Sequence, residues 1–384
     1  MGSQLVSTDA KNKLEDLSGI TILPGQNPYD AFIKACNDNP AEIQALYHAH
    51  RTKRNEQQKQ KFIAPDFKEL IIDPFLLRLE NPEMELGFQD PRNCLVFWAR
   101  PPDHIVRLAA HLQALLKKAA PNVWLMPQHR MHLTALEVTH SKTPEEITAL
   151  TDTMRSAIPY IADYTYSHRS RLVKPMISYD LSAFAISFLP AAGEPPLGPP
   201  PALTATQKAV IEGDSYTYHH LRRDVFDLAQ STGVPIESRY QVPSAHITLG
   251  RYLTEKDHET PEARAKWVEI IDGINAWLET EVWDLKDGEW VGEREGWMRG
   301  MDSCGMEGEG RSGSVRVSET GIQARQLERL GMLQKRSFRL QVHKWWQSSR
   351  RARLIDNFDT LGMFVEMTDR VNHDKRFFVT QLCD

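Results

Sequence analysis

The sequence contains little cysteine, and its four cysteines, Cys36, Cys94, Cys304 and Cys383, lie far apart. Disulfide-stabilised small domains and structural zinc sites depend on closely spaced cysteines, so both classes are excluded. Long apolar runs are missing as well. The longest, such as 181–190, have the length of one strand, whereas a membrane helix needs about 18 or more apolar residues. We therefore expect a protein that has no membrane partner.

The first twenty residues lack the apolar core of a secretory signal. With the scarcity of cysteine, this absence predicts an intracellular protein, either cytoplasmic or nuclear. An excess of positive charge is absent too, because 46 Lys and Arg stand against 51 Asp and Glu, a net charge of -5. This balance excludes the broad basic surface that binds duplex DNA, but it allows a pocket for one or two nucleotides.

The chain of 384 residues exceeds the usual length of one domain, about 100–200 residues. Residues 1–88 are predicted to form a helical N-terminal extension with a disordered start. Helices begin near Pro28 and Pro40, each with proline in the first turn. The second half of this second helix, residues 50–61, is polar on all sides, so we expect it to be either solvated or bound elsewhere. Residues 301–384 open with an irregular glycine-rich stretch. We expect an atypical, poorly ordered tail whose reading frame has been assigned incorrectly.

The central part, residues 89–300, repeats one order of elements: strand, helix, strand, strand. The first unit is predicted at 94–99, 103–116, 123–126 and 131–138, and the second at 181–189, 221–228, 237–242 and 245–253. We expect two lobes, at about 93–160 and 170–300, which are free to exchange strands. The cleft between two such lobes is the expected place for a site.

Four His-x-Thr triplets occur, at positions 50, 132, 246 and 258, where chance alone supplies about one. The triplets at 50 and 258 lie in the polar helix and in a charged loop, and we take them to be coincidental. The other two each open an apolar strand, MHLTALEV and AHITLGRYL. Because side chains alternate along a strand, His132 and Thr134 share one face, and so do His246 and Thr248.

Two such strands facing each other would surround one small volume with two imidazoles and two hydroxyls. A neutral histidine can take a proton from an attacking oxygen, while a protonated histidine gives one to a leaving oxygen. Both forms exist near neutrality, since the unperturbed pKa of histidine is about 6.5. Threonine hydroxyls can hydrogen-bond the phosphate oxygens. No metal-binding motif accompanies either histidine, so we expect neither a metal nor another cofactor.

The paired motifs in a duplicated segment resemble the 2H phosphoesterase superfamily, which includes 2′-5′ RNA ligase-like proteins and cyclic nucleotide phosphodiesterases. The resemblance covers about residues 93–300. It implies an α+β, duplicated bilobal 2H phosphoesterase-like fold, with antiparallel sheets lining a central cleft and helices outside. It also implies metal-independent hydrolysis of cyclic phosphates, with His132 and His246 as the catalytic pair and Thr134 and Thr248 as phosphate-binding residues.

Four further residues are candidates for substrate binding. Tyr252 shares the face of the second motif in a regular strand, where it is suited either to stack on a base or to pack in the core. Arg251 points away from that face unless Gly250 makes a bulge. Arg130 and Lys174 are additional candidates in the cleft.

These observations predict a phosphoric diester hydrolase that acts on a small nucleotide or an RNA terminus, such as a 2′,3′-cyclic nucleotide or a cyclic-phosphate RNA end. One alternative is an RNA-end processing enzyme, acting on 2′-5′ or 3′-5′ linkages or resembling a ligase. Another is a non-catalytic nucleotide- or RNA-binding module, and a third is a scaffold that acts through its N-terminal 90 residues. The acidic net charge favours a short substrate over long RNA.

Overall fold

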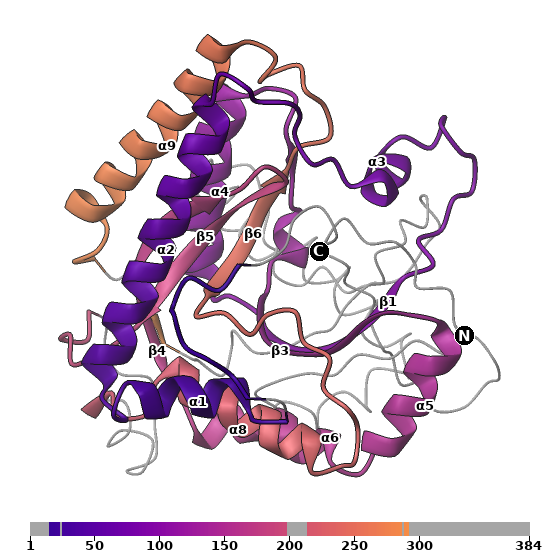
Figure 1. The fold of residues 1–384 in the computed structure, drawn as a ribbon, viewed down its shortest axis with the longest axis vertical. Helices are drawn as coiled ribbons and strands as arrows, with labels where there is room; N and C mark the ends of the chain where they lie inside the picture. Colours follow the sequence, from indigo (N-terminus) through magenta and orange to yellow (C-terminus); the bar gives the residue numbers. More distant parts are fainter. Residues whose placement is uncertain (1–14, 24, 198–212, 286–287, 292–384) are drawn as a thin grey trace, which may run out of the picture. The chain divides into compact units, whose positions relative to one another are not determined.

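The computed structural model describes residues 15–23, 25–197, 213–285 and 288–291, so the predictions for 1–14 and for the tail at 301–384 lie outside it. The described chain is mixed α+β and contains two antiparallel sheets, with the strand orders β1-β3 and β2-β6-β5-β4-β7 (Figure 1). The strands are β1 (Asn93–Ala99), β2 (Trp124–Leu125), β3 (Leu133–Lys142), β4 (Arg171–Tyr179), β5 (Ala183–Pro190), β6 (Ala245–Arg251) and β7 (Trp290–Val291).

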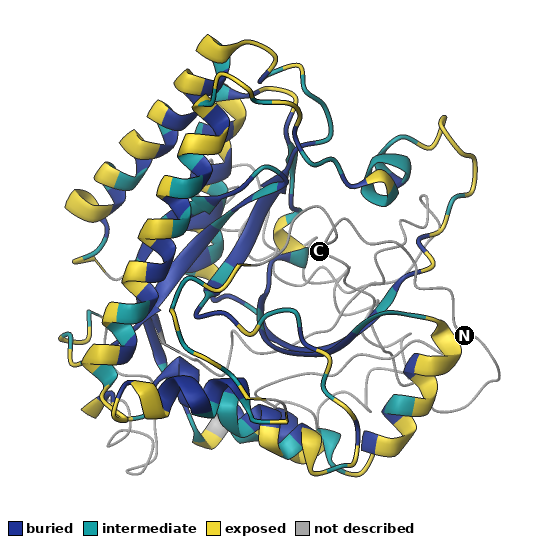
Figure 2. Cartoon of the chain, in the orientation of Figure 1, coloured by how far each residue is buried: buried dark blue, intermediate teal, exposed yellow. Residues whose placement is uncertain are grey.

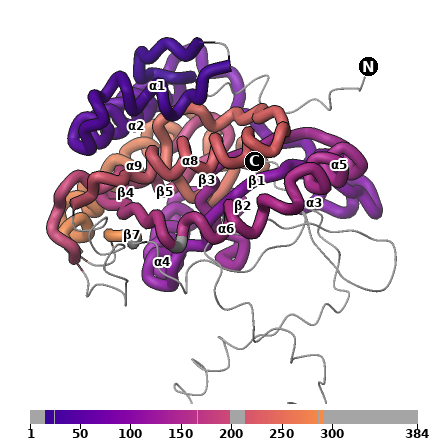
Figure 3. The backbone as a smooth tube through the Cα atoms, turned by 90° about the horizontal axis from the view of Figure 1, so that it is seen from below, coloured from indigo at the N-terminus to yellow at the C-terminus, as the bar shows by residue number. Residues whose placement is uncertain are grey.

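The helices are α1 (Pro28–Ala35), α2 (Pro40–Ile63), α3 (Pro74–Glu80), α4 (Asp103–Ala119), α5 (Pro144–Met154), α6 (Ile158–Ser167), α8 (Tyr218–Gln230) and α9 (Pro261–Glu281), and a 3-10 turn spans Gln128–Arg130. Helices α2 and α4 lie on opposite sides of the five-stranded sheet (Figure 3). Helix α9 contacts β4 and both of these helices. None of the helices in the described ranges has the length and apolar character needed to cross a membrane.

Both N-terminal helices start at the predicted prolines, and each start has a side-chain cap. The Asn27 side chain accepts hydrogen bonds from the backbone amides of the first turn of α1, and Pro28 follows it. Asn39 and Pro40 repeat this arrangement at α2. Asparagine satisfies amides that have no partner inside the helix, and proline has no amide hydrogen to satisfy, so the two residues together fix the first turn.

The predicted order of strand, helix, strand and strand is confirmed in the first unit, as β1, α4, β2 and β3. Strand β1 pairs with β3, and six of its seven residues are buried. Strand β2 pairs instead with β6, where Trp124 lies opposite Arg251. A strand from the first predicted lobe therefore belongs to the sheet of the second.

The predicted strand at 237–242 is wrong, because the segment is a loop. Its polar backbone groups bond to side chains and to a neighbouring strand instead of to a ladder. The fully buried Arg222 donates hydrogen bonds to the carbonyl oxygens of Tyr240 and Val242. The amide of Glu237 donates to the carbonyl of Val138 in β3 at 2.8 Å. These bonds hold the loop alongside β3.

The N-terminal helices share one hydrophobic core with the sheets. Ile43, Tyr47 and Phe62 of α2 are at most 1% exposed. The polar part of α2 is buried on the side that faces the sheet, so of the two alternatives, solvated or bound elsewhere, full solvation is wrong (Figure 2). Its buried polar residues are His50, Arg51, Asn55 and Gln58.

Candidate active site

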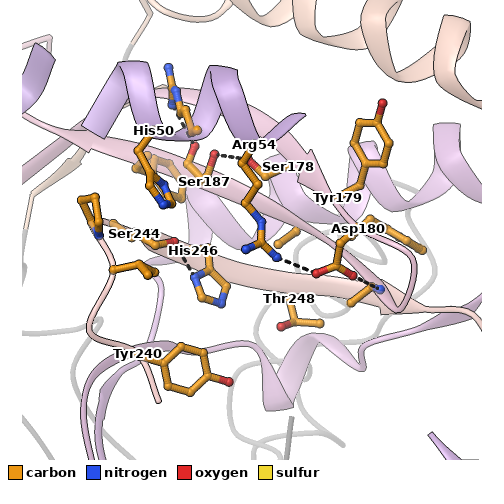
Figure 4. A pocket seen from close by; sticks show the side chains of 18 of the residues that line it. His50, Arg54, Ser178, Tyr179, Asp180, Ser187, Tyr240, Ser244, His246 and Thr248 are labelled. Atoms are coloured by element: carbon orange, nitrogen blue, oxygen red, sulfur yellow. Dashed lines mark hydrogen bonds and ion pairs between the residues drawn. The ribbon is translucent and has the colours of Figure 1, made fainter. Parts of the chain in front are cut away.

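Strand β6 presents the second motif to a pocket. His246 and Thr248 both line it, and so do Ser178 and Ser187 from the neighbouring strands (Figure 4). Nδ1 of His246 lies 3.0 Å from the Ser244 hydroxyl, which orients the ring. The pocket has a cavity volume of about 130 Å³. One water needs about 10–15 Å³ on this measure, so the space accommodates a chemical group larger than water.

A β-bulge brings Arg251 to the same pocket. Thr248 lies opposite Ala185 and Gly250 lies opposite Phe184, so Leu249 has no partner of its own in the register. The extra residue shifts the alternation of side chains by one position. Arg251 consequently lines the pocket together with the histidine and the threonine of the motif. The sequence placed Arg251 on the motif face only if a bulge formed at Gly250. A bulge is present, although its unpaired residue is Leu249, one position before Gly250.

The same bulge turns Tyr252 away from the pocket. Tyr252 is 1% exposed and packs in the core against the rings of Phe184 and Trp267. Its hydroxyl accepts a hydrogen bond from the indole of Trp267 at 3.1 Å. Of the two predicted roles for Tyr252, the structure favours core packing, and base stacking is wrong for this conformation.

The first motif lies outside the pocket lining. His132 precedes β3 and is 6% exposed, with its ring 5.6 Å from the ring of Trp98. Its Nδ1 lies 2.8 Å from the carbonyl oxygen of Arg130. Since a carbonyl oxygen can only accept, Nδ1 carries a proton, and Nε2 is the ring nitrogen that bears the lone pair in this tautomer. Thr134 is half-buried, and β3 contacts β6. The structure therefore brings the two motif strands into contact but assigns only the second motif to this pocket.

Arg130 and Lys174 do not line the pocket either. Lys174 pairs with Glu194 across 2.6 Å and has a left-handed backbone, with a φ of 55°. The ammonium group bonds to Glu194 and Gln44, both outside the pocket lining, so Lys174 is a poor candidate for substrate binding in this pocket. Arg130 is half-buried at the end of the 3-10 turn, where its backbone carbonyl orients His132.

The wall opposite β6 comes from α2, which the sequence did not implicate. His50 and Arg54 are four residues apart, so they share one face of the helix, and both line the pocket. His50 belongs to one of the triplets that we took to be coincidental. A usable signal was present: Tyr47, His50, Arg51, Asn55, Gln58 and Phe62 recur at the spacing of one helix face.

The lining is basic although the protein is acidic. Three arginines, Arg51, Arg54 and Arg251, stand against Asp180, which gives the lining a net charge of +2. Burial lowers the pKa of Arg51 to about 9, because its guanidinium is removed from water and the opposing charge of Glu279 offsets this only in part. A pocket with this charge favours an anionic ligand.

The loop at 237–242 completes the site. The ring of Tyr240 lies 5.9 Å from the ring of His246, at an interplanar angle of 45°. The carbonyl of Tyr240 accepts hydrogen bonds from Arg222 and from the hydroxyl of Tyr29. Helices α1 and α8 thus fix the loop, and the loop in turn places an aromatic ring beside the histidine.

Across the described residues, no cluster of three or more His, Cys, Asp or Glu side chains could hold a metal ion. The arrangement offers two imidazoles, several hydroxyls and guanidinium groups around one cavity, a set that suits binding of a phosphate and proton transfer to or from it. No protein-family model matches the chain, and no relative is found among curated proteins.

Proposed function

We propose that the protein is a metal-independent phosphodiesterase that hydrolyses a 2′,3′-cyclic nucleotide or a cyclic-phosphate RNA end. The observation that carries this proposal is the joint placement of His246, Thr248 and Arg251 at one pocket with a basic lining. The proposal includes the finer fold, a duplicated 2H phosphoesterase-like architecture. The two antiparallel sheets and the contact between β3 and β6 support it.

In the proposed reaction, one histidine removes a proton from water as the water oxygen attacks phosphorus. The bond between phosphorus and one ribose oxygen breaks, and the other histidine protonates that oxygen. The products are a phosphomonoester and a free hydroxyl. We assign these roles to His132 and His246. The hydrogen bond from Nδ1 of His132 to the carbonyl of Arg130 supports a general-base function, because it leaves Nε2 as the nitrogen that can accept a proton.

Thr248 and Arg251 are proposed to bind the non-bridging phosphate oxygens. A hydroxyl and a guanidinium are hydrogen-bond donors, and the cationic donor also opposes the negative charge that grows on those oxygens in the transition state. Thr134 has the corresponding role on the first motif. Thr134 is half-buried and belongs to β3, which contacts β6, and this position supports the assignment.

The second candidate function is a non-catalytic nucleotide-binding module. One observation favours it: His132 and Thr134 do not line the pocket that contains His246. A pocket with one motif histidine can bind a phosphate, but the proposed hydrolysis needs a second group that transfers a proton.

Hydrolysis of the four 2′,3′-cyclic nucleotides in EDTA separates these functions. We expect turnover by the unaltered protein and a loss of about 10²–10⁴-fold in kcat for His132→Ala and for His246→Ala, the usual range for a general acid or base. His111→Ala, which removes an exposed histidine on α4, is the matched control and should retain full turnover. Binding of the same nucleotides without turnover would support the binding module. Turnover that stops in EDTA would contradict the metal-independent mechanism.

A further inference from the structure

Arg54 is a cation that the fold holds in a fixed position on the α2 wall. Its Nη2 donates to Asp180 at 2.7 Å, and both side chains are largely buried. The other oxygen of Asp180 accepts from the backbone amides of Ser182 and Ala183, at 2.8 and 3.0 Å. The carboxylate is therefore locked in the turn between β4 and β5, and it orients the guanidinium. Planar guanidinium groups in a fixed orientation bind phosphate well, because they offer several donors at once.

His50 lies beside Arg54 on the same wall, across the pocket from His246 (Figure 4). It is 3% exposed, and its Nε2 is buried without a hydrogen-bond partner. A buried polar atom that lacks a partner destabilises the folded protein unless a ligand supplies the bond. Burial, with the nearby charge of Arg54, lowers the pKa of His50, and an anion in the pocket would act in the opposite direction.

The pocket lining on this wall carries a surplus of positive charge. Among the lining residues of the α2 side, Arg51 and Arg54 stand against Asp180, a net charge of +1. Glu279, which is not part of the lining, raises the pKa of Arg51 but does not offset its burial. Arg51 is 5% exposed and donates to the carbonyl of Lys174, while its Nε and Nη2 have no partner. A single phosphodiester at His246 carries one negative charge and faces the β6 wall. It leaves the surplus on the α2 wall without an anion.

We propose that the α2 wall, through Arg54 and His50, binds a second phosphate group of the substrate. The preferred ligand would then be a nucleotide or RNA end that carries another phosphate close to the one at His246. This inference rests on the proposed function for the placement of the first phosphate. The second subsite is independent of whether that phosphate is hydrolysed.

Binding measured by calorimetry on the full chain tests this inference without requiring turnover. The probes are adenosine 3′-monophosphate and adenosine 3′,5′-bisphosphate, which differ by one phosphate. We expect the bisphosphate to bind at least about tenfold more tightly, the value of one or two charge-assisted hydrogen bonds. Arg54→Gln should reduce this ratio to near one. Lys53→Gln removes an exposed charge from the same helical turn and should leave the ratio unchanged.

A ratio near one in the unaltered protein overturns the inference, and this result requires no variant to fold. A ratio that persists in Arg54→Gln, or that falls equally in Lys53→Gln, overturns it as well, because the preference then comes from elsewhere. Hydrolysis of cyclic nucleotides without a preference for the bisphosphate would leave the proposed function intact and reject the second subsite. A preference for the bisphosphate without hydrolysis of cyclic nucleotides would support the second subsite and reject the proposed function.

Discussion

His258 occupies a cage of aromatic rings in the core. It is fully buried, with ring centroids 5.0 Å from Tyr252, 5.2 Å from Trp267 and 6.1 Å from Phe62. Neither ring nitrogen has a hydrogen-bond partner. Burial, with the nearby charge of Arg264, lowers the pKa of His258 from 6.5 to about 4. The native protein thus keeps this ring neutral where an unfolded chain would protonate it.

This difference predicts a loss of stability in mild acid. Between pH 6.5 and 4 the unfolded chain binds a proton at His258 that the native protein does not, so the free energy of unfolding falls as the pH falls through this window. One pKa unit corresponds to about 1.4 kcal/mol, so the shift contributes at most about 3 kcal/mol. Of this amount, about 2 kcal/mol should be lost between pH 7 and pH 5.

Urea denaturation at pH 7 and pH 5 measures the effect, with His258→Phe as the comparison. The substitution keeps a planar ring among the aromatic residues. It removes no side-chain hydrogen bond, because neither ring nitrogen of His258 makes one. The variant should lose about 2 kcal/mol less than the unaltered protein between the two pH values. Equal losses in both proteins would show that His258 is protonated in the native state.

At the scale of single residues, the sequence identified the right strand but not every role along it. Its alternation placed His246 and Thr248 on one face, as found. The roles of Arg251 and Tyr252 depend on a bulge at Leu249, which shifts the alternation by one position. A bulge depends on how two strands pair, so the strand's own residues do not reveal it. Gly250 was the only local signal.

Strand β6 can form this bulge because Gly250 leaves room for its neighbours. A β-carbon at position 250 would lie 2.3 Å from the carbonyl oxygen of Trp124 and 2.4 Å from the ring of Phe184. Both neighbours resist displacement, since one is backbone and the other is a fully buried ring. The close approach lets β2 and β5 flank β6 at the point where the bulge aims Arg251 at the pocket.

We predict that Gly250→Ala lowers the free energy of unfolding by about 2 kcal/mol or more, the cost of overpacking a rigid site. Gly273→Ala is the matched control, because Gly273 lies inside α9 with no atom within 4 Å of the added carbon. That change should raise stability by about 0.5–1 kcal/mol, as alanine favours a helix over glycine. Chemical denaturation measures both. A neutral Gly250→Ala would mean that β2 is not packed against β6 as described.

At the scale of elements, a helix or strand could be predicted from the sequence where its backbone hydrogen bonds follow one regular pattern. Strand β1 and helix α4 follow from an apolar run and from helical spacing, and both were predicted. Strand β4 was missed, because Lys174 and Pro175 interrupt it with a bulge that only pairing with β5 reveals. The loop at 237–242 was taken for a strand, because its bonds to the distant Arg222 leave no local pattern.

At the scale of the whole molecule, the N-terminal helices are structural parts of both the core and the site. Helix α1 contacts α8, and α2 contacts β4, β5 and α9. The Tyr47 hydroxyl lies 2.7 Å from Nδ1 of the buried His219, and Asn55 donates to the carbonyl of Ile177 in β4 at 2.8 Å. These bonds link α2 to elements more than a hundred residues away in the sequence. A scaffold that acts through a separable N-terminal segment does not fit such contacts.

Removing residues 1–63 should therefore abolish cooperative folding, not merely an accessory function. The deletion removes Ile43 and Phe62, so the core side chains that pack against these two residues would become exposed. It would also remove α2 from the face of the sheet that this helix covers. Fully burying one large apolar side chain is worth about 1.5–3 kcal/mol, and a domain has only about 5–15 kcal/mol of stability in total. Thermal denaturation followed by circular dichroism should show no sharp transition in the shortened chain.

A nicked protein distinguishes the loss of these contacts from the loss of chain continuity. Pro65 and Asp66 are exposed just after α2, so a protease site inserted between them can be cut in the folded protein. Because α1 and α2 remain bound through the buried core, the nicked protein should keep one cooperative transition and its affinity for nucleotides. A chain without residues 1–63 that melts as sharply as the nicked protein would contradict this account. The N-terminal helices would then be an addition to a core that is complete without them.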